Sequence, residues 1–209
     1  MSDSHRDTIL AEALALIPAS GFSDATIAAA AAAAGIGKRE TLDAFPKGAE
    51  SLAEAFSLWA DGAMQARMAQ DPSTRMTERA THAVRARIEV LIPHREAARR
   101  AMAFLALPQH AALGARLMAA SVDAMWRAAG DKASDFSYYT KRALLGGVYG
   151  ATFLYWLSDA SEGSAATWAF LDARIRDVMQ IGKFTASARE ALAKLPDPFA
   201  FLAGLRGGR

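Results

Sequence analysis

The chain has 209 residues, of which 52% are hydrophobic and 22% charged, an ordinary globular composition that supplies a packed core. It contains no cysteine, so disulfides, thiol nucleophiles and cysteine-ligated metals are excluded. The net charge of +2 hides an asymmetry: residues 1–57 carry eight acidic and four basic side chains, a net charge of −4, and the remainder carries +6.

The N-terminal part of the chain predicts three short helices. Their expected bounds are residues 6–18, 23–34 and about 38–44. Pro18 and Gly21 are expected to close the first helix, and Ser23 is a suitable N-cap for the second. Glycines at positions 35 and 37 make a tight break before the third. Two short helices joined by a glycine turn are typical of a helix-turn-helix.

The rest of the chain predicts longer helices, because its apolar residues recur at spacings of three and four. The first two of these helices are expected to end near residues 70 and 91. The next four are expected at about 94–106, 109–129, 135–158 and 165–181, and a possible helix from about 186 is interrupted by prolines. Asp71 and Ser134 are the expected caps of the second and fifth of these helices. The uncharged stretch 143–157 is 15 residues long, which is short for a membrane span and predicts a helix buried on every side.

These elements predict an all-α protein with a small head and a larger body. The expected parts are a helix-turn-helix head at 1–46, a helical body at 47–183 and a C-terminal tail at 184–209. Architecture of this kind does not by itself identify a function.

Residues that could carry catalysis are scarce. The four histidines, His5, His82, His94 and His110, have no second ligand at the helical spacings of three or four, so no metal site is expected. The chain has neither a glycine-rich phosphate loop nor a nucleophile elbow. We therefore predict a protein without catalysis, metal or cofactor.

The predicted helix-turn-helix is a poor candidate for DNA binding. A protein that holds duplex DNA neutralises phosphates with Lys and Arg, whereas this head is acidic, and its third helix has two bases and two acids. In comparison with TetR-type repressors, Gly35, Phe45 and Leu52 resemble structural positions of the motif. The Tyr and Lys that contact phosphate in that family correspond to Leu42 and Gly48. The scaffold therefore resembles a TetR repressor whose DNA contacts are lost.

Two segments of the body combine charged with apolar or aromatic side chains. In 91–107, three arginines lie beside apolar residues, which indicates either an ordinary amphipathic helix or a basic rim near phospholipid headgroups. In 135–142, adjacent aromatic residues cannot all face one core, which favours a protein interface. Gly146, Gly147 and Gly150 follow at a cost of about 1 kcal/mol each, which is tolerable where a helix or ligand approaches closely.

Three stretches of the chain resemble signature segments of the ubiquinone-biosynthesis accessory family called coenzyme Q protein nine. They read PHREAARRAMAFLALP, VDAMWRAAGDKASDFSYYTKRA and FLDARI. The similarity spans about residues 5–183, and its most specific part is the block DFSYYTKR. It implies a TetR-repressor-like fold, a homodimer formed through the last body helices and an internal pocket for lipids, including isoprenoid ones.

The resemblance also implies a function. Members of the family assist the di-iron hydroxylase that acts on demethoxyubiquinone, presenting its substrate from the membrane without catalysis of their own. The expected ligand is thus an isoprenoid quinone precursor or a phospholipid. The alternative is a TetR-type, ligand-responsive transcriptional repressor, whose pocket would control an operator.

The resemblance and the apolar pattern together select candidate site residues. The docking surface for the hydroxylase carries over to Asp135, Tyr138, Tyr139 and Arg142, with Tyr138 where the family often has Trp. The expected walls of the lipid cavity are bulky apolar residues: Phe104, Leu105, Leu117, Met118, Val122, Met125, Leu144, Val148, Tyr149 and Phe153. For each of these ten residues, packing in a plain core is the alternative.

The two ends of the chain bear on location. Phe199, Leu202 and Leu205 form a short apolar stripe, which indicates an amphipathic helix in a bilayer interface. The alternatives are a frayed terminus and a helix packed on the dimer partner. The N-terminus reads MSDSHRDT and resembles neither a secretory signal nor a transit peptide. Because mitochondrial family members carry a presequence, we expect a bacterial protein, cytoplasmic and peripherally associated with the inner membrane.

Overall fold

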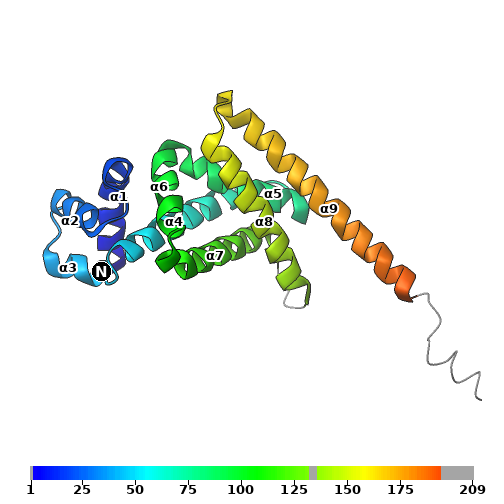
Figure 1. Cartoon of the computed structure of the whole chain (residues 1–209), viewed down its shortest axis with the longest axis horizontal. Coiled ribbons are helices and arrows are strands. Elements are labelled where there is room, and N and C mark those ends of the chain that lie inside the picture. The colour runs from blue at the N-terminus through cyan, green and yellow to red at the C-terminus, as the bar shows by residue number, and fades with distance from the viewer. Residues whose placement is uncertain (1, 132–135, 194–209) are drawn as a thin grey trace, which may run out of the picture. The chain divides into compact units, whose positions relative to one another are not determined.

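The computed structural model describes the backbone of residues 2–131 and 136–193 and the side chains of 4–131 and 140–180 (Figure 1). Within these residues all regular structure is helical, which confirms the all-α prediction. The α-helices are α1 (Ser2–Ser20), α2 (Asp24–Ala33), α3 (Lys38–Ala44), α4 (Ala49–Met68), α5 (Met76–Leu91), α6 (Arg95–Leu105), α7 (Ala111–Ala129), α8 (Phe136–Ser158) and α9 (Ala165–Ala193). Short 3₁₀ turns at Ile92–His94, Pro108–His110 and Glu162–Ser164 precede α6, α7 and α9.

The chain divides into two compact units, with the boundary inside α9. Met1–Leu171 form the first unit and Asp172–Arg209 the second. The first unit contains both the helix-turn-helix and most of the expected body. The expected divisions after residues 46 and 183 stay predictions.

The head consists of α1, α2 and α3, with α1 packed against both of the others. Ser23 caps α2 as predicted, because its hydroxyl accepts a hydrogen bond from the backbone N–H of Thr26 at 3.1 Å. Pro18 does not end α1 but lies inside it. The helix ends instead at Ser20, and the next residue, Gly21, has a φ of 67° that suits glycine and an N–H that still reaches the carbonyl of Ile17 at 2.8 Å.

The larger part of the first unit is built around α4, α5 and α7, which contact one another pairwise (Figure 1). Helix α8 packs on α7 and α5, while α6 contacts α1, α7 and α8. The largest fully buried side chains, which mark the core of this unit, are Trp156, Ile9, Ile17, Leu52, Met64, Ile88, Leu91, Met125 and Leu171. The apolar stripes seen in the sequence are therefore the helix faces that pack together in the core of this unit.

Two expectations about the body helices are wrong. Asp71 does not cap α5, which begins at Met76; its carboxylate instead accepts from the backbone N–H of Ser73 at 3.1 Å and lies 3.2 Å from His82 Nδ1. Helix α8 is not buried on every side: Trp156 is fully buried, but Leu154 is 51% exposed. One face of α8 packs on the other helices of the unit and the opposite face does not.

The ends of the remaining helices agree with the sequence within a few residues, except that α9 continues to Ala193. Gly130 closes α7 in the left-handed conformation, with φ of 89°. Ser134 lies outside the described residues, so its expected role as a cap stays a prediction. No helix in the described part of the chain is both long enough and apolar enough to cross a membrane.

Candidate functional site

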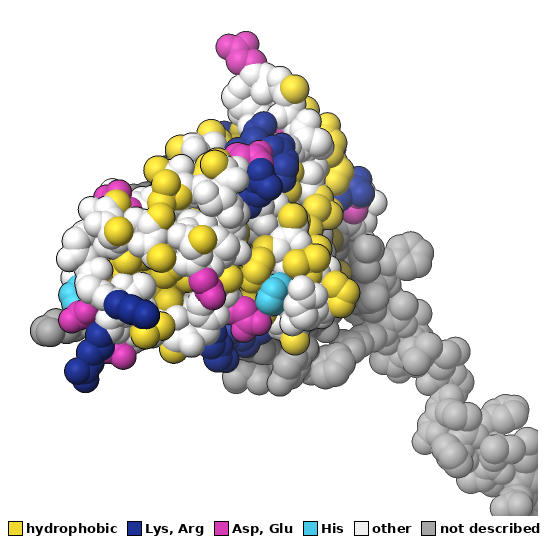
Figure 2. All heavy atoms as spheres, turned by 60° about the vertical axis from the view of Figure 1, so that its left-hand side comes forward, with side chains coloured by type: hydrophobic (Ala, Val, Ile, Leu, Met, Phe, Trp, Pro, Cys, Tyr) yellow, Lys and Arg dark blue, Asp and Glu magenta, His cyan; other side chains and the backbone are white. Residues whose placement is uncertain are grey.

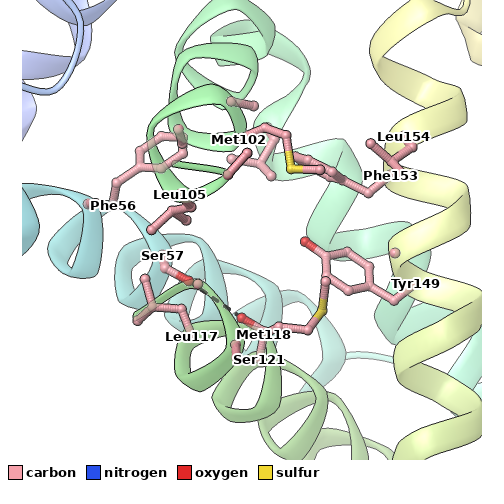
Figure 3. A pocket seen from close by; sticks show the side chains of 18 of the residues that line it. Phe56, Ser57, Met102, Leu105, Leu117, Met118, Ser121, Tyr149, Phe153 and Leu154 are labelled. Atoms are coloured by element: carbon pink, nitrogen blue, oxygen red, sulfur yellow. Dashed lines mark hydrogen bonds between the residues drawn. The ribbon is translucent and has the colours of Figure 1, made fainter. Parts of the chain in front are cut away.

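A cavity of about 450 Å³ lies between α4, α5, α6, α7 and α8, all within the first unit (Figure 3). Its volume falls within the range of small-molecule sites. The lining residues are Ala53, Phe56, Ser57, Arg87, Leu91, Ala98, Ala101, Met102, Leu105, Ala106, Ala111, Gly114, Ala115, Leu117, Met118, Ser121, Tyr149, Gly150, Phe153 and Leu154. Sixteen of these twenty side chains are aliphatic, aromatic without a hydroxyl, or absent, so the walls are predominantly apolar.

Small residues create much of this space. Six alanines and two glycines account for eight of the twenty lining residues. A Cβ added at Gly114 would lie 3.3 Å from the carbonyl oxygen of Leu105, so this glycine permits the close approach of α6 and α7. At Gly146 and Gly150 an added Cβ would make ordinary contacts at 3.6 Å, so close packing does not require either glycine.

A cluster of buried polar side chains forms one part of the cavity wall. Arg87 of α5 donates from Nε to Asp61 Oδ1 at 2.6 Å and from Nη1 to the hydroxyl of Tyr149. Its Nη2 donates to Ser121 Oγ at 3.0 Å and to Ser57 Oγ at 3.2 Å. Ser121 in turn donates to Asp61 Oδ2 at 3.0 Å. We call Arg87, Asp61, Tyr149, Ser121 and Ser57 the arginine cluster.

The arginine cluster lies at one end of the cavity. Among the residues that each helix contributes to the lining, Ser57 is the last from α4, Ser121 the last from α7 and Tyr149 the first from α8. In Figure 3 the hydroxyl of Tyr149 points into the open space. Met102 and Leu154, on the far side of that space in Figure 3, are 36% and 51% exposed, and Met118 is 37% exposed, so the cavity is open beside these three side chains.

The environment of the cluster sets the charge of its members. Burial disfavours the charged form of Arg87, but Tyr149 and the carboxylate of Asp61 outweigh it, so the pKa of Arg87 is raised. Burial also raises the pKa of Tyr149, against the opposing effect of Arg87. Tyr149 is therefore a neutral phenol at physiological pH, beside an ion pair whose charges cancel.

Half of the ten predicted cavity residues line the cavity. They are Leu105, Leu117, Met118, Tyr149 and Phe153. Val122, Met125 and Val148 are buried in the core, and Leu144 is half-buried without lining the space. Phe104 stacks on His110, with ring centroids 4.1 Å apart. A single face of each helix meets the cavity, and the apolar pattern alone does not distinguish that face from the neighbouring core.

The sequence reasoning missed the polar end of the cavity. Arg87 stands three residues after Val84 and four before Leu91, on the apolar stripe of α5, and is 5% exposed. A charged residue on an apolar helical stripe was the signal that could have revealed this polar end. An Arg at such a position is buried, and a buried Arg requires a carboxylate and further acceptors around it. Phe56, Met102 and Leu154 were also missed, since they are ordinary members of apolar stripes.

Three of the four predicted docking residues, Tyr138, Tyr139 and Arg142, lie in the first two turns of α8. Asp135 falls outside the described residues, and Tyr138 and Tyr139 lie in the first turn of α8, with side chains outside the described part. Arg142 is described: its Nη2 lies 2.7 Å from Asp123 Oδ1, and its Nη1 3.6 Å from Asp131 Oδ2. These ion pairs tie α8 to the end of α7.

The predicted membrane residues Phe199, Leu202 and Leu205 lie outside the described residues. Among the side chains that are described, no group of three or more His, Asp or Glu residues could hold a metal ion. The predictions about membrane binding, catalysis and cofactors stay predictions.

The head presents a mixed surface where a repressor would present a basic one. On α3, Lys38, Arg39 and Asp43 are all exposed. Gly48 has φ of 52°, and a Cβ there would lie 2.2 Å from Asp24 Oδ1, which accepts the backbone N–H of Ala49 at 3.0 Å. On the face shown in Figure 2, basic side chains form small groups among acidic and apolar ones. The position that corresponds to the phosphate-contacting Lys therefore lies against a carboxylate.

Comparison with known proteins finds relatives of part of the chain. The COQ9 family model matches residues 111–182. "Ubiquinone biosynthesis protein COQ9, mitochondrial" of Rattus norvegicus is 43% identical over 115 residues, covering 54% of this chain and 37% of the relative. The Homo sapiens protein of the same description is 39% identical over 115 residues, covering 54% of this chain and 36% of the relative. The matched part thus spans little more than a third of the length of each relative.

A solved structure shares the fold. The TetR transcriptional regulator from Nitrosomonas europaea ATCC 19718 superposes with a TM-score of 0.64 at 21% sequence identity, covering 82% of this chain and 95% of that protein. At this identity the likeness shows the fold alone.

The comparisons correct one prediction and confirm another. The expected localisation, in the bacterial cytoplasm at the inner membrane, is contradicted, because the curated relatives are named as mitochondrial proteins. It rested on the comparison of the N-terminal residues with the presequence of mitochondrial family members and on the alanine and arginine richness of the chain. The predicted resemblance is confirmed: residues 111–182 of this chain match the COQ9 family model, and the fold resembles that of a TetR regulator.

Proposed function

We propose that the protein is a non-catalytic, lipid-binding accessory protein of ubiquinone biosynthesis, which presents isoprenoid quinone precursors to the demethoxyubiquinone hydroxylase. The observation that carries this proposal is the apolar cavity, because its α7 and α8 walls lie within the region matched by the COQ9 model. The relatives that share this region are named for ubiquinone biosynthesis.

The chemistry of the walls suits a long apolar chain. Burial of each CH₂ group stabilises a complex by about 0.8 kcal/mol, so a few isoprene units supply substantial affinity. Met102 and Met118 line the space with flexible side chains that adapt to the shape of a ligand. An isoprenoid quinone precursor is the proposed ligand, and a phospholipid would present similar chains.

Native mass spectrometry with lipid extraction, on protein purified from cells that make ubiquinone, tests this function. We expect a stoichiometric isoprenoid lipid bound to the wild type. Ala101→Phe, which fills the cavity from α6, should abolish the bound lipid, whereas the matched control Ala103→Phe, at an exposed position of the same helix outside the lining, should retain it. Wild-type protein that carries no lipid would contradict the proposal.

We further propose that the start of α8, with Asp135, Tyr138, Tyr139 and Arg142, docks the hydroxylase. Replacing both Tyr138 and Tyr139 by Ala should weaken capture of the purified hydroxylase without unfolding the protein. Leu42→Ala, an exposed apolar change on α3, is the control and should leave capture unchanged. Capture that survives the double substitution would show that the interface lies elsewhere.

A homodimer through the last body helices completes the proposal. On α8, Leu154 and Tyr155 are exposed, and the Tyr155 ring stacks on Phe170 at 4.6 Å between centroids. Exposed large apolar side chains of this kind mark association surfaces. Tyr155→Glu, at a position outside the cavity lining, should convert a dimer into a monomer in light scattering, and an unchanged mass would place the interface away from Tyr155.

The second candidate function is a ligand-responsive repressor, favoured by the likeness to a TetR regulator. The exposed acidic residues of α3 and the contact of Gly48 with Asp24 count against it. Operator binding that persists in a gel shift as salt rises from about 50 to 200 mM would support the repressor.

A further inference from the structure

The arginine cluster has no counterpart in a plain lipid pocket, whose end would be apolar. Burying an ion pair with three hydroxyl groups costs desolvation that an apolar core of the same shape avoids. Arg87, Ser121 and Tyr149 are only 5%, 1% and 4% exposed. The cluster is nevertheless part of the cavity lining, through Arg87, Tyr149 and both serines.

Within the described part of the chain, the hydrogen bonds of the cluster leave two donors unused beside the cavity. Both carboxylate oxygens of Asp61 are occupied, by Arg87 and Ser121. The hydroxyl of Tyr149 accepts from Arg87, and within the described part of the chain its own hydrogen has no acceptor. Arg87 has five N–H groups and uses four of them in the cluster, which leaves one on Nη1, beside Tyr149.

Charge then decides what kind of acceptor fits. The carboxylate of Asp61 neutralises Arg87, so the cluster has no net charge to offset a buried anion. An ammonium or amide N–H at this end would leave the Tyr149 hydrogen and the remaining Arg87 N–H without an acceptor. A neutral oxygen with free lone pairs, such as a carbonyl or ether, satisfies the Tyr149 hydroxyl without a charge.

We propose that the cavity binds its ligand with the polar end inward, where Tyr149 donates a hydrogen bond to a neutral carbonyl or ether oxygen and the apolar chain extends toward Met102 and Leu154. This inference rests on the proposed lipid binding and adds the orientation and the chemical class of the buried end. Tyr149 is the residue that selects between ligands with the same chain.

Three ligands that share one ring and one chain test the proposal: 2-geranyl-1,4-benzoquinone, geranylbenzene and 4-geranylbenzoate. Isothermal titration of the full chain should show the quinone binding about tenfold more tightly than geranylbenzene, the scale of one satisfied buried hydrogen bond. The benzoate, which brings an uncompensated charge, should bind more weakly than the quinone.

Tyr149→Phe removes the donor and keeps the ring. In this variant the preference for the quinone over geranylbenzene should fall from about tenfold to about twofold or less, with the affinity for geranylbenzene retained. Phe153→Leu, in the apolar wall, is the matched control and should change both affinities by the same factor. The infrared carbonyl stretch of the bound quinone should lie at lower frequency in the wild type than in Tyr149→Phe.

The outcomes separate the two proposals. Equal binding of quinone and geranylbenzene by the wild type would overturn this inference and leave lipid binding intact, as would a preference for the benzoate. Binding of none of the three would overturn lipid binding, and the inference with it. If Tyr149→Phe does not fold, the wild-type ligand series still decides.

Discussion

The head and the cavity use charged residues in opposite ways. On α3, the charged side chains project into solvent, where each can change with little effect on the fold. In the cavity, Arg87 and Asp61 lie inside the unit, 2.6 Å apart and enclosed by hydroxyl groups. The charged side chains of α3 therefore contribute to the surface, whereas Arg87 and Asp61 contribute to the packing of the interior.

The strongest test of this contrast removes one member of the buried ion pair. Asp61→Asn leaves Arg87 charged and buried without its carboxylate, and should lower the free energy of unfolding by about 3 to 5 kcal/mol. Asp43→Asn, the same chemical change on exposed α3, should lie within about 0.5 kcal/mol of the wild type. Urea denaturation gives both values. Similar losses in the two variants would show that the buried carboxylate contributes no more to stability than the exposed one.

A second test addresses the junction between the head and α4. Gly48→Ala should destabilise by about 1 to 3 kcal/mol, since φ of 52° is strained for alanine and its Cβ would collide with Asp24. Asp24→Ala in the same background should recover the part that is due to the collision, and a double-mutant cycle separates the two terms. If the two substitutions show no coupling energy, backbone strain alone accounts for the loss of stability in Gly48→Ala.

A stabilising change is expected on α8. An added Cβ at Gly147 meets no atom within 4 Å, so Gly147→Ala should raise the free energy of unfolding by up to about 1 kcal/mol through helix propensity alone. Thermal unfolding measures the gain. A loss of stability would indicate that a partner occupies the space beside this residue.

The smallest effect concerns His94, whose ring meets Trp59 edge-on at 5.2 Å between centroids. Burial lowers the pKa of His94 below its ordinary value of 6.5. Because the unfolded chain then binds more protons, stability contributed by neutral His94 is present above about pH 6.5 and is lost as the pH falls below it. His94→Gln should flatten the dependence of stability on pH between 7.5 and 5.5, which is roughly one unit on either side of the pKa of histidine in the unfolded chain. Urea midpoints measured across that window follow the change. Identical slopes in the two proteins would contradict this assignment.

Local rules predicted most of the fold. Helical spacing, the Ser23 cap and Gly130 placed helices within a few residues, because each depends on neighbours in the sequence. Asp71 illustrates the limit: the same residue can cap a helix or close a turn with Ser73, and contact with His82 favours the second. Which of the two roles Asp71 takes therefore depends on a residue eleven positions further along the chain.

The cavity was predictable only in part, for a different reason. Leu117 and Met125 are both apolar members of α7, yet one lines the space and the other is buried in the core. The difference depends on the rotation of α7 relative to its neighbours, which spacing within one helix does not specify. Arg87 could have been recognised as a buried charge, but its partners come from three other helices.

The abundance of alanine in the cavity wall has a consequence for the evolution of its ligand range. Six of the lining positions are alanine, and an alanine codon is one nucleotide change away from a valine codon. Each such change subtracts a few methyl volumes from the space while leaving the arginine cluster untouched. In the proposed lipid complex, such substitutions would change the length of the hydrocarbon that fits independently of the polar group that the arginine cluster contacts.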